Sequence, residues 1–222
     1  MKTWPELCEQ ALNLHPDMSL EAMLGAPPLE REALRALPDD RVFSVMTRRI
    51  FRAGLRHALV DAKWPAFEQA FYRFNPEAVQ EMSDEALEAL MQNDQIIRHF
   101  GKIKSTRDNA VMMVDLAQEY GSVAGMIADW PEEDMVGLWT LLKKRGKQLG
   151  GNSAAYFLRM LGKDTFMLTD DVVTALKAQG VIDRKPTSQR DLKQVQQVFN
   201  QWREQSGTPL CQISRLLAHS IG

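Results

Sequence analysis

Cysteine and long apolar runs are both scarce in this chain of 222 residues, and each scarcity excludes a class of protein. Cys8 and Cys211 are its two cysteines, so the sequence offers no C-x-x-C framework for zinc, and two isolated thiols indicate a reducing, cytoplasmic compartment. No apolar run approaches the ~18 residues that a membrane span needs. The first eight residues also lack the apolar core of a secretory signal. We therefore expect a cytoplasmic protein with no membrane partner.

An excess of charge of one sign is also missing. Lysine and arginine number 27 and aspartate and glutamate number 29, which gives a net charge of −2. A near-neutral chain gives no compositional sign of nucleic-acid binding, so any basic surface must be local. With 45% hydrophobic and 25% charged residues, the composition is that of a folded protein rather than a disordered one.

β-Branched apolar residues are sparse, which bears on the fold class. Valine and isoleucine total 21 against 47 leucines and alanines, and no stretch alternates apolar and polar residues over the length of a strand. Proline follows Asn75, Trp130 and Thr208, where it suits the first turn of a helix, and Thr187 and Thr208 are expected helix caps. The sequence predicts an all-α fold of about ten short helices. Four of these are expected at 41–60, 64–73, 77–91 and 99–120.

The organisation of the chain shows no internal repeat and no polar linker, so we treat residues 1–222 as one unit of two closely packed helical subdomains. The expected zones are N-terminal helices at 1–40, a helical subdomain at 41–130, a helical hairpin and acidic turn at 131–179, and C-terminal helices at 180–222.

A glycine-rich turn between two helical segments is the first feature that indicates a function. The segment 132–145 has an apolar face, residues 146–151 contain three glycines, and a second helix follows. Such a turn leaves backbone N–H groups pointing outward, and these suit a DNA phosphate. Four cations lie beside it at 143–147. The alternative is a plain helical hairpin with a solvated charged face. The candidate DNA contacts are Lys144, Gly146, Lys147, Gly150, Gly151, Asn152 and Ser153.

An acidic turn downstream is the second feature. The apolar stretch 165–169 enters a helix through Asp170 and Asp171. Taken alone, the pair is explained by capping, with Thr169 or Asp170 as the cap and Asp171 favoured by the helix dipole. Of the two acids, Asp170 is the expected cap.

The order of these two features resembles the helix-hairpin-helix DNA glycosylase superfamily, in which a Gly-rich hairpin and a helix precede a catalytic Asp that opens the next helix. In bifunctional members of that superfamily a lysine lies two residues after the last hairpin glycine and eighteen before that Asp. Here the corresponding position is Ser153, eighteen residues before Asp171. The resemblance implies that Asp171 is catalytic and that the enzyme is monofunctional, because no lysine is present to form a Schiff base.

Two further blocks look like the 3-methyladenine DNA glycosylase I family. They are F-Y-R-F-N-P-E-A-V at 71–79 and I-I-R-H-F-G-K-I at 96–103, and A-G-L at 53–55 fits the same register. The resemblance covers roughly residues 42–175. It implies excision of a damaged, alkylated base from double-stranded DNA, in the bacterial cytosol or nucleoid. Nothing in the sequence indicates oligomerisation, so we expect a monomer.

The chemistry of that reaction needs one well-placed carboxylate. Cleavage of an N-glycosidic bond builds positive charge on the deoxyribose, and a carboxylate stabilises this charge and orients or deprotonates the attacking water. No metal or organic cofactor is required, and we expect none. The nucleotide must be flipped out of the duplex while a side chain fills the gap. Candidates for the base pocket or the wedge are Arg49, Leu55, His57, Trp64 and Tyr156, and Arg98 and Lys102 are further candidate DNA contacts.

Departures from the family pattern leave the substrate open. Two of the family's zinc ligands fall at Asp171 and Ala175, so no zinc site is expected. The family's base-contacting glutamate falls at Arg49, which cannot accept hydrogen bonds from a cationic adenine and would repel it. Aromatic residues at helical spacing are also more often core than pocket. Two alternatives therefore stand beside the main interpretation: a non-catalytic protein of the same fold that binds damaged DNA, and a glycosylase for a different lesion.

Overall fold

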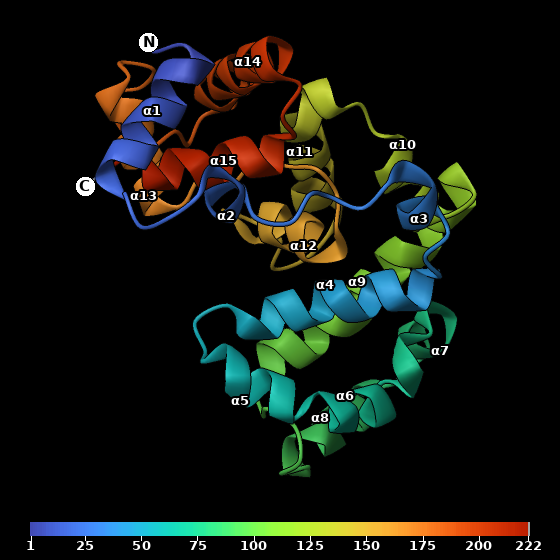
Figure 1. The fold of residues 1–222 in the computed structure, drawn as a ribbon. Coiled ribbons are helices and arrows are strands. Elements are labelled where there is room, and N and C mark those ends of the chain that lie inside the picture. Colours follow the sequence, from blue (N-terminus) through green and yellow to red (C-terminus); the bar gives the residue numbers. More distant parts are fainter. Residues whose placement is uncertain (222) are drawn as a thin grey trace. The chain divides into compact units, whose positions relative to one another are not determined.

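Helices make up the regular structure of residues 1–221, the part of the chain that the computed structural model describes (Figure 1). These residues form fifteen α-helices and three short 3-10 helices, and no strand occurs among them. The all-α prediction is confirmed. The expected number of helices was too low, because several of the expected helices are broken in two.

The helices form two compact units, and each unit is assembled from separate stretches of the chain. The first unit contains Met1–Leu29, Trp130–Leu138 and the chain from Gly162 onward. The second unit contains Glu30–Asp129 and Trp139–Leu161. Segments from both ends of the sequence thus share one core.

In the first unit the final helix is central. The elements of this unit are α1 (Trp4–Leu14), α2 (Leu20–Leu24), η3 (Glu132–Asp134), α13 (Asp170–Ala178), α14 (Gln189–Ser206) and α15 (Leu210–His219). Helix α15 packs against α1, α2, α13 and α14. The rings of Phe166 and Phe199 stack with their centroids 4.3 Å apart, and Trp202 meets Phe199 edge-on. All three rings are fully buried, and burial of one such side chain stabilises a fold by about 1.5–3 kcal/mol.

The second unit is built around one long helix. Its elements are α3 (Arg31–Arg35), α4 (Asp39–Arg52), α5 (His57–Ala62), α6 (Trp64–Ala70), η1 (Tyr72–Phe74), α7 (Pro76–Gln80), α8 (Asp84–Ala89), η2 (Leu90–Gln92), α9 (Phe100–Tyr120), α10 (Val123–Asp129) and α12 (Ser153–Leu161). Helix α9 packs against α4, α7, α8 and α10, and α4 also packs against α12 (Figure 1). A cluster of buried aromatic rings fills the space beside α4. Its members are Phe43, Phe51, Trp64, Phe67, Phe71 and Phe74.

Three expected helices have different limits. The helix expected at 41–60 ends at Arg52, because Ala53 is extended and Gly54 adopts φ +76°, a left-handed conformation that favours glycine. The helix expected at 77–91 is interrupted where the side chain of Ser83 accepts a hydrogen bond from Ala86 N and starts a new helix. The helix expected at 64–73 ends at Ala70 and is followed by three residues with positive φ, at 72–74.

Helix caps agree only in part with the sequence interpretation. Asn75 caps α7 by accepting a hydrogen bond from Ala78 N, as its position before proline predicts. Ser188 rather than Thr187 caps α14. Thr208 caps nothing, because α15 begins after Pro209. A cap prediction wrong by one residue is expected where several hydrogen-bonding residues adjoin.

Candidate functional site

The glycine-rich turn connects α11, Met135–Arg145, to α12. Gly146 directly follows α11 and donates its N–H to Leu142 O at 2.8 Å. A Cβ atom at Gly146 would lie 2.6 Å from Leu149 Cδ1 and 2.9 Å from Leu142 O, so the packing of the turn requires glycine there. Leu149 is 1% exposed and attaches the turn to the core, while Gly151 has φ +57°. Gly146 is therefore a packing residue.

Asn109 of α9 fixes the turn from outside. Its Oδ1 accepts a hydrogen bond from Lys147 N at 2.7 Å, and its Nδ2 donates to Lys147 O at 3.1 Å. Asn109 is fully buried, so both groups depend on this pairing. The sequence analysis did not assign this role. The signal was an Asn followed by Ala110, Met112 and Met113, on the apolar side of a helix.

Free backbone donors remain at the outer side of the turn. Gly150 and Gly151 are exposed, their amides donate to no other described residue, and a Cβ on either would meet open space. The amide of Ser153 instead donates to Gly150 O at 3.1 Å, so Ser153 cannot supply the phosphate contact expected of its backbone. Asn152 lies half-buried and accepts the N–H of Tyr156 through its carbonyl at 2.9 Å.

The cations beside the turn divide into two kinds. Arg145 forms ion pairs with Asp115 and Glu119 of α9, which neutralise it. Three exposed lysines form no ion pair with any residue of the described chain. These are Lys143, Lys144 and Lys147. The turn thus combines unpaired amides with unpaired positive charge, the combination that suits a phosphate group.

Asp171 opens α13 as its second residue, in the first unit. Its side chain is exposed and makes no hydrogen bond or ion pair with the described residues. Thr169 is the cap, since its Oγ1 accepts from Val172 N at 3.3 Å. Asp170 is ion-paired with Lys185 at 3.0 Å, so the expectation that Asp170 caps the helix was wrong. The two acids therefore differ, because the carboxylate of Asp171 has no hydrogen-bond or ion-pair partner among the described residues, whereas that of Asp170 is paired with Lys185.

Two buried side chains hold the stretch that leads to Asp171. Ser214 of α15 accepts a hydrogen bond from Met167 N at 3.1 Å and donates to Met167 O at 3.3 Å. Asp164 accepts from Leu210 N at 2.9 Å and from Cys211 N at 2.8 Å, and so caps α15. These contacts attach the extended backbone before Asp171 to one helix, α15. Neither contact could be predicted from the sequence, because each joins residues about fifty positions apart.

Lys102 is not the surface cation that the sequence analysis expected. Its side chain is 7% exposed, and its Nζ donates to Ala53 O at 2.7 Å and to Phe51 O at 3.3 Å. These carbonyls lie at the C-terminal end of α4, where a positive charge is favoured by the helix dipole. Burial, and then the charge of Arg49, lower the pKa of Lys102. Lys102 therefore positions the turn that carries Leu55 and has no free charge for DNA.

Arg49 and Tyr156 are brought together by α4 and α12. The guanidinium carbon of Arg49 lies 4.5 Å from the centroid of the Tyr156 ring, in a cation–π contact. The guanidinium is half-buried, its Nε is inaccessible and has no hydrogen-bond partner, and no carboxylate of the described chain pairs with it. Burial lowers the pKa of the Arg49 guanidinium. This is a desolvated cation whose partner within the described chain is an aromatic face.

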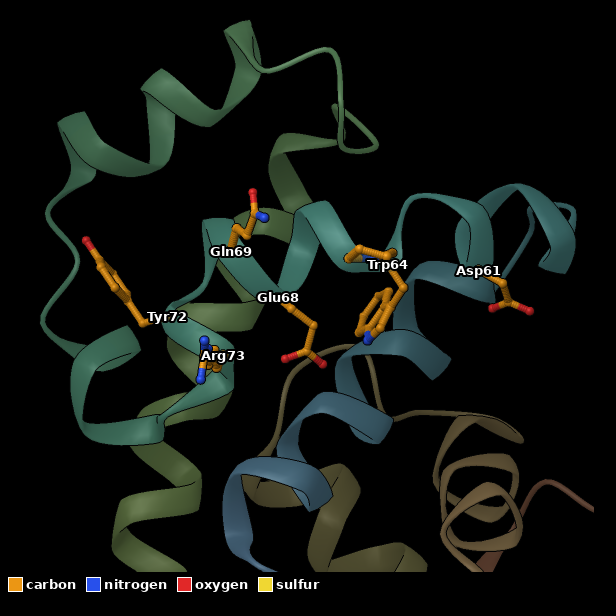
Figure 2. Close-up of a pocket in the computed structure, with 7 residues that line it drawn as sticks. Asp61, Trp64, Glu68, Gln69, Tyr72 and Arg73 are labelled. Atoms are coloured by element: carbon orange, nitrogen blue, oxygen red, sulfur yellow. The ribbon is translucent and has the colours of Figure 1, made fainter.

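Of the other candidates, Trp64 belongs to the core. It is 7% exposed, its Nε1 donates to Ser44 Oγ at 3.1 Å, and its ring stacks on Phe67 and Phe74. Its edge borders a hollow of about 930 Å³ lined by residues between Asp61 and Arg73. Figure 2 shows this hollow, with Tyr72 turned away from Trp64. We therefore assign Trp64 to packing rather than to a base pocket.

The remaining candidates lie on the surface and stay predictions. Leu55 is 36% exposed at the tip of the turn after α4, as a wedge requires. His57 is the exposed first residue of α5. Arg98 is exposed in the loop before α9 and forms no ion pair with the described residues.

Comparison with solved structures identifies the fold. The 8-oxoguanine glycosylase/lyase of Methanocaldococcus jannaschii, solved with a 15mer DNA containing 8-oxoguanine, is 15% identical; the match covers 96% of this chain and 95% of that one, with a TM-score of 0.56. A 3-methyladenine DNA glycosylase I is 26% identical over 59% of this chain and 82% of its own, with a TM-score of 0.51. The same enzyme from Staphylococcus aureus is 25% identical over 62% and 79%, also at 0.51. The fold is that of the DNA glycosylases.

The family follows from the sequence match. The methyladenine glycosylase family model matches residues 35–145, half of the chain. The chain therefore belongs to the methyladenine glycosylase family. The matched segment contains Arg49, the A-G-L turn and Lys102 and ends at Arg145, so the glycine-rich turn and Asp171 lie beyond it.

Residues 1–221 lack two further features. No three His, Cys, Asp or Glu side chains among them are grouped so that they could hold a metal ion. None of the helices in that part of the chain has the length and apolar character needed to cross a membrane.

Proposed function

We propose that this protein is a monofunctional DNA glycosylase that hydrolyses the N-glycosidic bond of a damaged, alkylated base in double-stranded DNA, as the first step of base excision repair. Its membership of the methyladenine glycosylase family supports the reaction class. The observation that carries the assignment is Asp171, a carboxylate at the start of α13 without a partner among the described residues, after an extended stretch that is hydrogen-bonded to α15. Ser153 supports hydrolysis without strand cleavage, because it occupies the position where an amine nucleophile would be needed.

The proposed step uses water as the nucleophile. The water oxygen forms a bond to C1′ of the deoxyribose while the C1′–N bond breaks, and the base leaves with the bonding electron pair. The proton that the water loses is taken up by the departing base where that base is neutral in DNA, and is released to solvent where the base is cationic in DNA. Positive charge develops on the sugar, and the carboxylate of Asp171 stabilises it. The same carboxylate orients the water or accepts its proton.

Binding of the duplex is assigned to the glycine-rich turn. The amides of Gly150 and Gly151, with Lys144 and Lys147, would hold a phosphate of the damaged strand, and Leu55 would fill the gap left by the flipped nucleotide. We propose that a single copy of the chain acts on the DNA. The absence of a disulfide between the two cysteines supports the proposed location in the bacterial cytosol.

The direct test is base release from methylated duplex DNA by wild type, Asp171→Asn and Asp170→Asn. We expect Asp171→Asn to lose at least about 100-fold in rate, the range for a group that acts by acid–base catalysis, while duplex affinity stays nearly unchanged. Asp170→Asn is the matched control, since it removes an adjacent exposed carboxylate that is paired with Lys185. Equal loss in both variants, or joint loss of binding and release, would assign Asp171 to the structure of the helix.

The monofunctional assignment has its own measurement. Borohydride traps the imine that forms when an enzyme amine attacks C1′ of the sugar. We expect no trapped adduct between wild-type protein and lesion-containing duplex, and strand breakage only after alkali treatment. A covalent adduct would contradict the assignment and would call for identification of the lysine involved.

A second function is favoured by one observation. Arg49 occupies the position of the base-contacting glutamate in the family pattern, and a cation there disfavours a cationic methylated base. A protein that binds damaged duplex without releasing a base would show lesion-dependent affinity with no product in any of these assays. That outcome would replace the enzymatic proposal.

A further inference from the structure

Arg49 of the second unit is a half-buried cation without a compensating negative charge among the described residues. A cation taken partly out of water is retained only where something compensates it, and here no carboxylate of the described chain does so. The neighbouring cation Arg52 gives no compensation, because it repels Arg49 and is itself paired with Asp61. The buried amine of Lys102 adds to the positive potential. A site that breaks the usual rule of charge pairing points to a ligand that completes it.

The geometry of Arg49 restricts that ligand. Tyr156 holds the guanidinium through one face of its ring, so the terminal N–H groups are left unused, and they form a flat fork of donors. A donor fork is matched by two adjacent acceptors in one plane. Among DNA components, the edge of a purine with O6 and N7 offers this pattern, and arginine binds it with two hydrogen bonds.

The positive charge of Arg49 disfavours bases that are themselves cationic. A purine that carries positive charge after methylation would be repelled by Arg49 and by the charge of Lys102, which interacts with Arg49, and methylation adds no hydrogen-bond acceptor to the base. A neutral base meets no such penalty. Undamaged guanine has the same edge but is stacked and paired with cytosine, whereas a mispaired or modified purine is flipped at lower cost.

We infer that Arg49, oriented by the ring of Tyr156, is the specificity residue of this protein and selects a neutral purine that carries oxygen at C6 and an unprotonated N7, such as hypoxanthine or O6-methylguanine. The inference rests on the proposed glycosylase reaction and replaces the cationic alkylated bases among its substrates by this class, of which O6-methylguanine is an alkylated member and hypoxanthine is not. Arg49 would touch the base edge, while Tyr156 is a positioning residue that holds the guanidinium. Bases that are cationic, such as 3-methyladenine, are discriminated against.

The test compares single-turnover base release from duplexes that contain hypoxanthine opposite thymine, O6-methylguanine, or 3-methyladenine. We expect wild type to favour hypoxanthine over 3-methyladenine, and Arg49→Gln to lose at least about tenfold on hypoxanthine, the factor that one two-bond base contact supplies. Arg49→Glu should reverse the preference. Arg190→Gln, which removes an exposed arginine of α14 in the other unit, is the charge-matched control and should leave the ratio between lesions unchanged.

Two results would overturn the inference. If Arg49→Gln reduces affinity equally for every duplex, damaged or not, and lowers the salt dependence of binding, then Arg49 contacts a phosphate. If the ratio of rates between lesions is unchanged in folded Arg49→Gln and Arg49→Glu proteins, then Arg49 has no role in selection. Thermal unfolding of each variant establishes that it is folded.

A binding measurement keeps this inference separate from the proposed reaction. The Arg49 Nε–H resonance is followed by NMR while hypoxanthine or 3-methyladenine is added as the free base. We expect a saturable shift with hypoxanthine and a weaker one with 3-methyladenine, because the free 3-methyladenine base, although neutral, carries an amino donor at C6 in place of the oxygen acceptor. Tyr156→Ala should reduce the affinity for hypoxanthine. Release of no base from any duplex would end the proposal of a glycosylase. In that case an equal response to the two free bases would end the proposal for Arg49 as well, and a preference for hypoxanthine would sustain it.

Discussion

At the scale of single residues, the second unit contains two cations that lie at least half-buried, Lys102 and Arg49, and their partners differ in kind. Lys102 is fully committed to the backbone, because its Nζ donates to two carbonyls at the end of α4. Arg49 has an aromatic face and no ionic partner in the described chain. Because carbonyl groups satisfy the charge of Lys102, this residue fixes the backbone at the end of α4. The charge of Arg49 lacks acceptors and is therefore available to a ligand.

Replacement of Lys102 by methionine tests the first of these roles. The variant removes two hydrogen bonds from a charged donor and leaves the carbonyls of Phe51 and Ala53 without a partner, so the free energy of unfolding should fall by about 1–3 kcal/mol. Hydrogen exchange at the turn that carries Leu55 should accelerate. Lys104→Met, an exposed change on the same helix, should alter stability by less than about 0.5 kcal/mol. Equal stability of the two variants would contradict the assigned role.

Glu68 makes the stability of the second unit dependent on pH. Burial alone would raise the pKa of its carboxyl, but hydrogen bonds from Arg41 and Ser44 outweigh burial and hold the pKa below its ordinary value of 4.5. Since the carboxylate is favoured in the folded state, its stabilising contribution is present above that ordinary value. It is lost as the pH falls through the lower, folded pKa.

The corresponding measurement is the difference in unfolding free energy between wild type and Glu68→Gln. We expect this difference to be greatest near about pH 6 and to shrink as the pH falls through the lowered pKa of folded Glu68, because the side chain at position 68 then becomes neutral in both proteins. A difference that stays constant across this range would show that the ionised form of Glu68 contributes nothing.

At the scale of elements, the glycine-rich turn is rigid on its inner side and open on its outer side. Asn109 and Leu149 fix it to the second unit, and Gly146 allows the close packing with Leu142. The exposed amides of Gly150 and Gly151 therefore keep their direction without help from a ligand. A preformed group of donors binds a phosphate with little loss of conformational entropy.

Salt dependence of DNA binding tests the assignment of this turn. Lys144→Gln and Lys147→Gln should each weaken binding to damaged and undamaged duplexes alike, and each should reduce the slope of log K against log salt by about 0.9. Lys193→Gln, at an exposed position of α14, should leave the slope unchanged. If all three variants have the wild-type slope, the turn is a structural hairpin.

At the scale of the whole molecule, the sequence predicted what is local and failed where partners are distant. The glycine-rich turn and the absence of strands were readable because turn residues and helix formers act within a few positions. The limits expected for the helix at 41–60 were wrong because Gly54, with φ +76°, ends it, and a single glycine within a helical pattern does not by itself indicate a stop. Burial of Lys102 depends on carbonyls about fifty positions away, so the residues next to it in the sequence do not predict it.

The division of the chain between the two units also follows no local signal. No linker marks it, and α11 passes from one unit to the other without a break in its helical structure. The resemblance of three sequence blocks to known glycosylases predicted the fold class, which the structure confirms. The roles of Asp171, Leu55 and His57 remain predictions, since they concern a DNA complex.

The way in which the first unit is assembled has a consequence for biosynthesis. The side chain of Trp202 donates its Nε1–H to Lys2 O across 200 positions of sequence, and α1 packs against α14 and α15. A ribosome delivers α1 and α2 long before their partners, whereas most of the second unit emerges as one stretch and can fold during translation. The apolar faces of α1 and α2 therefore stay exposed to solvent until α15 has been synthesised and has left the ribosome. The start of this chain is therefore the segment that most needs a chaperone while the remainder is being made.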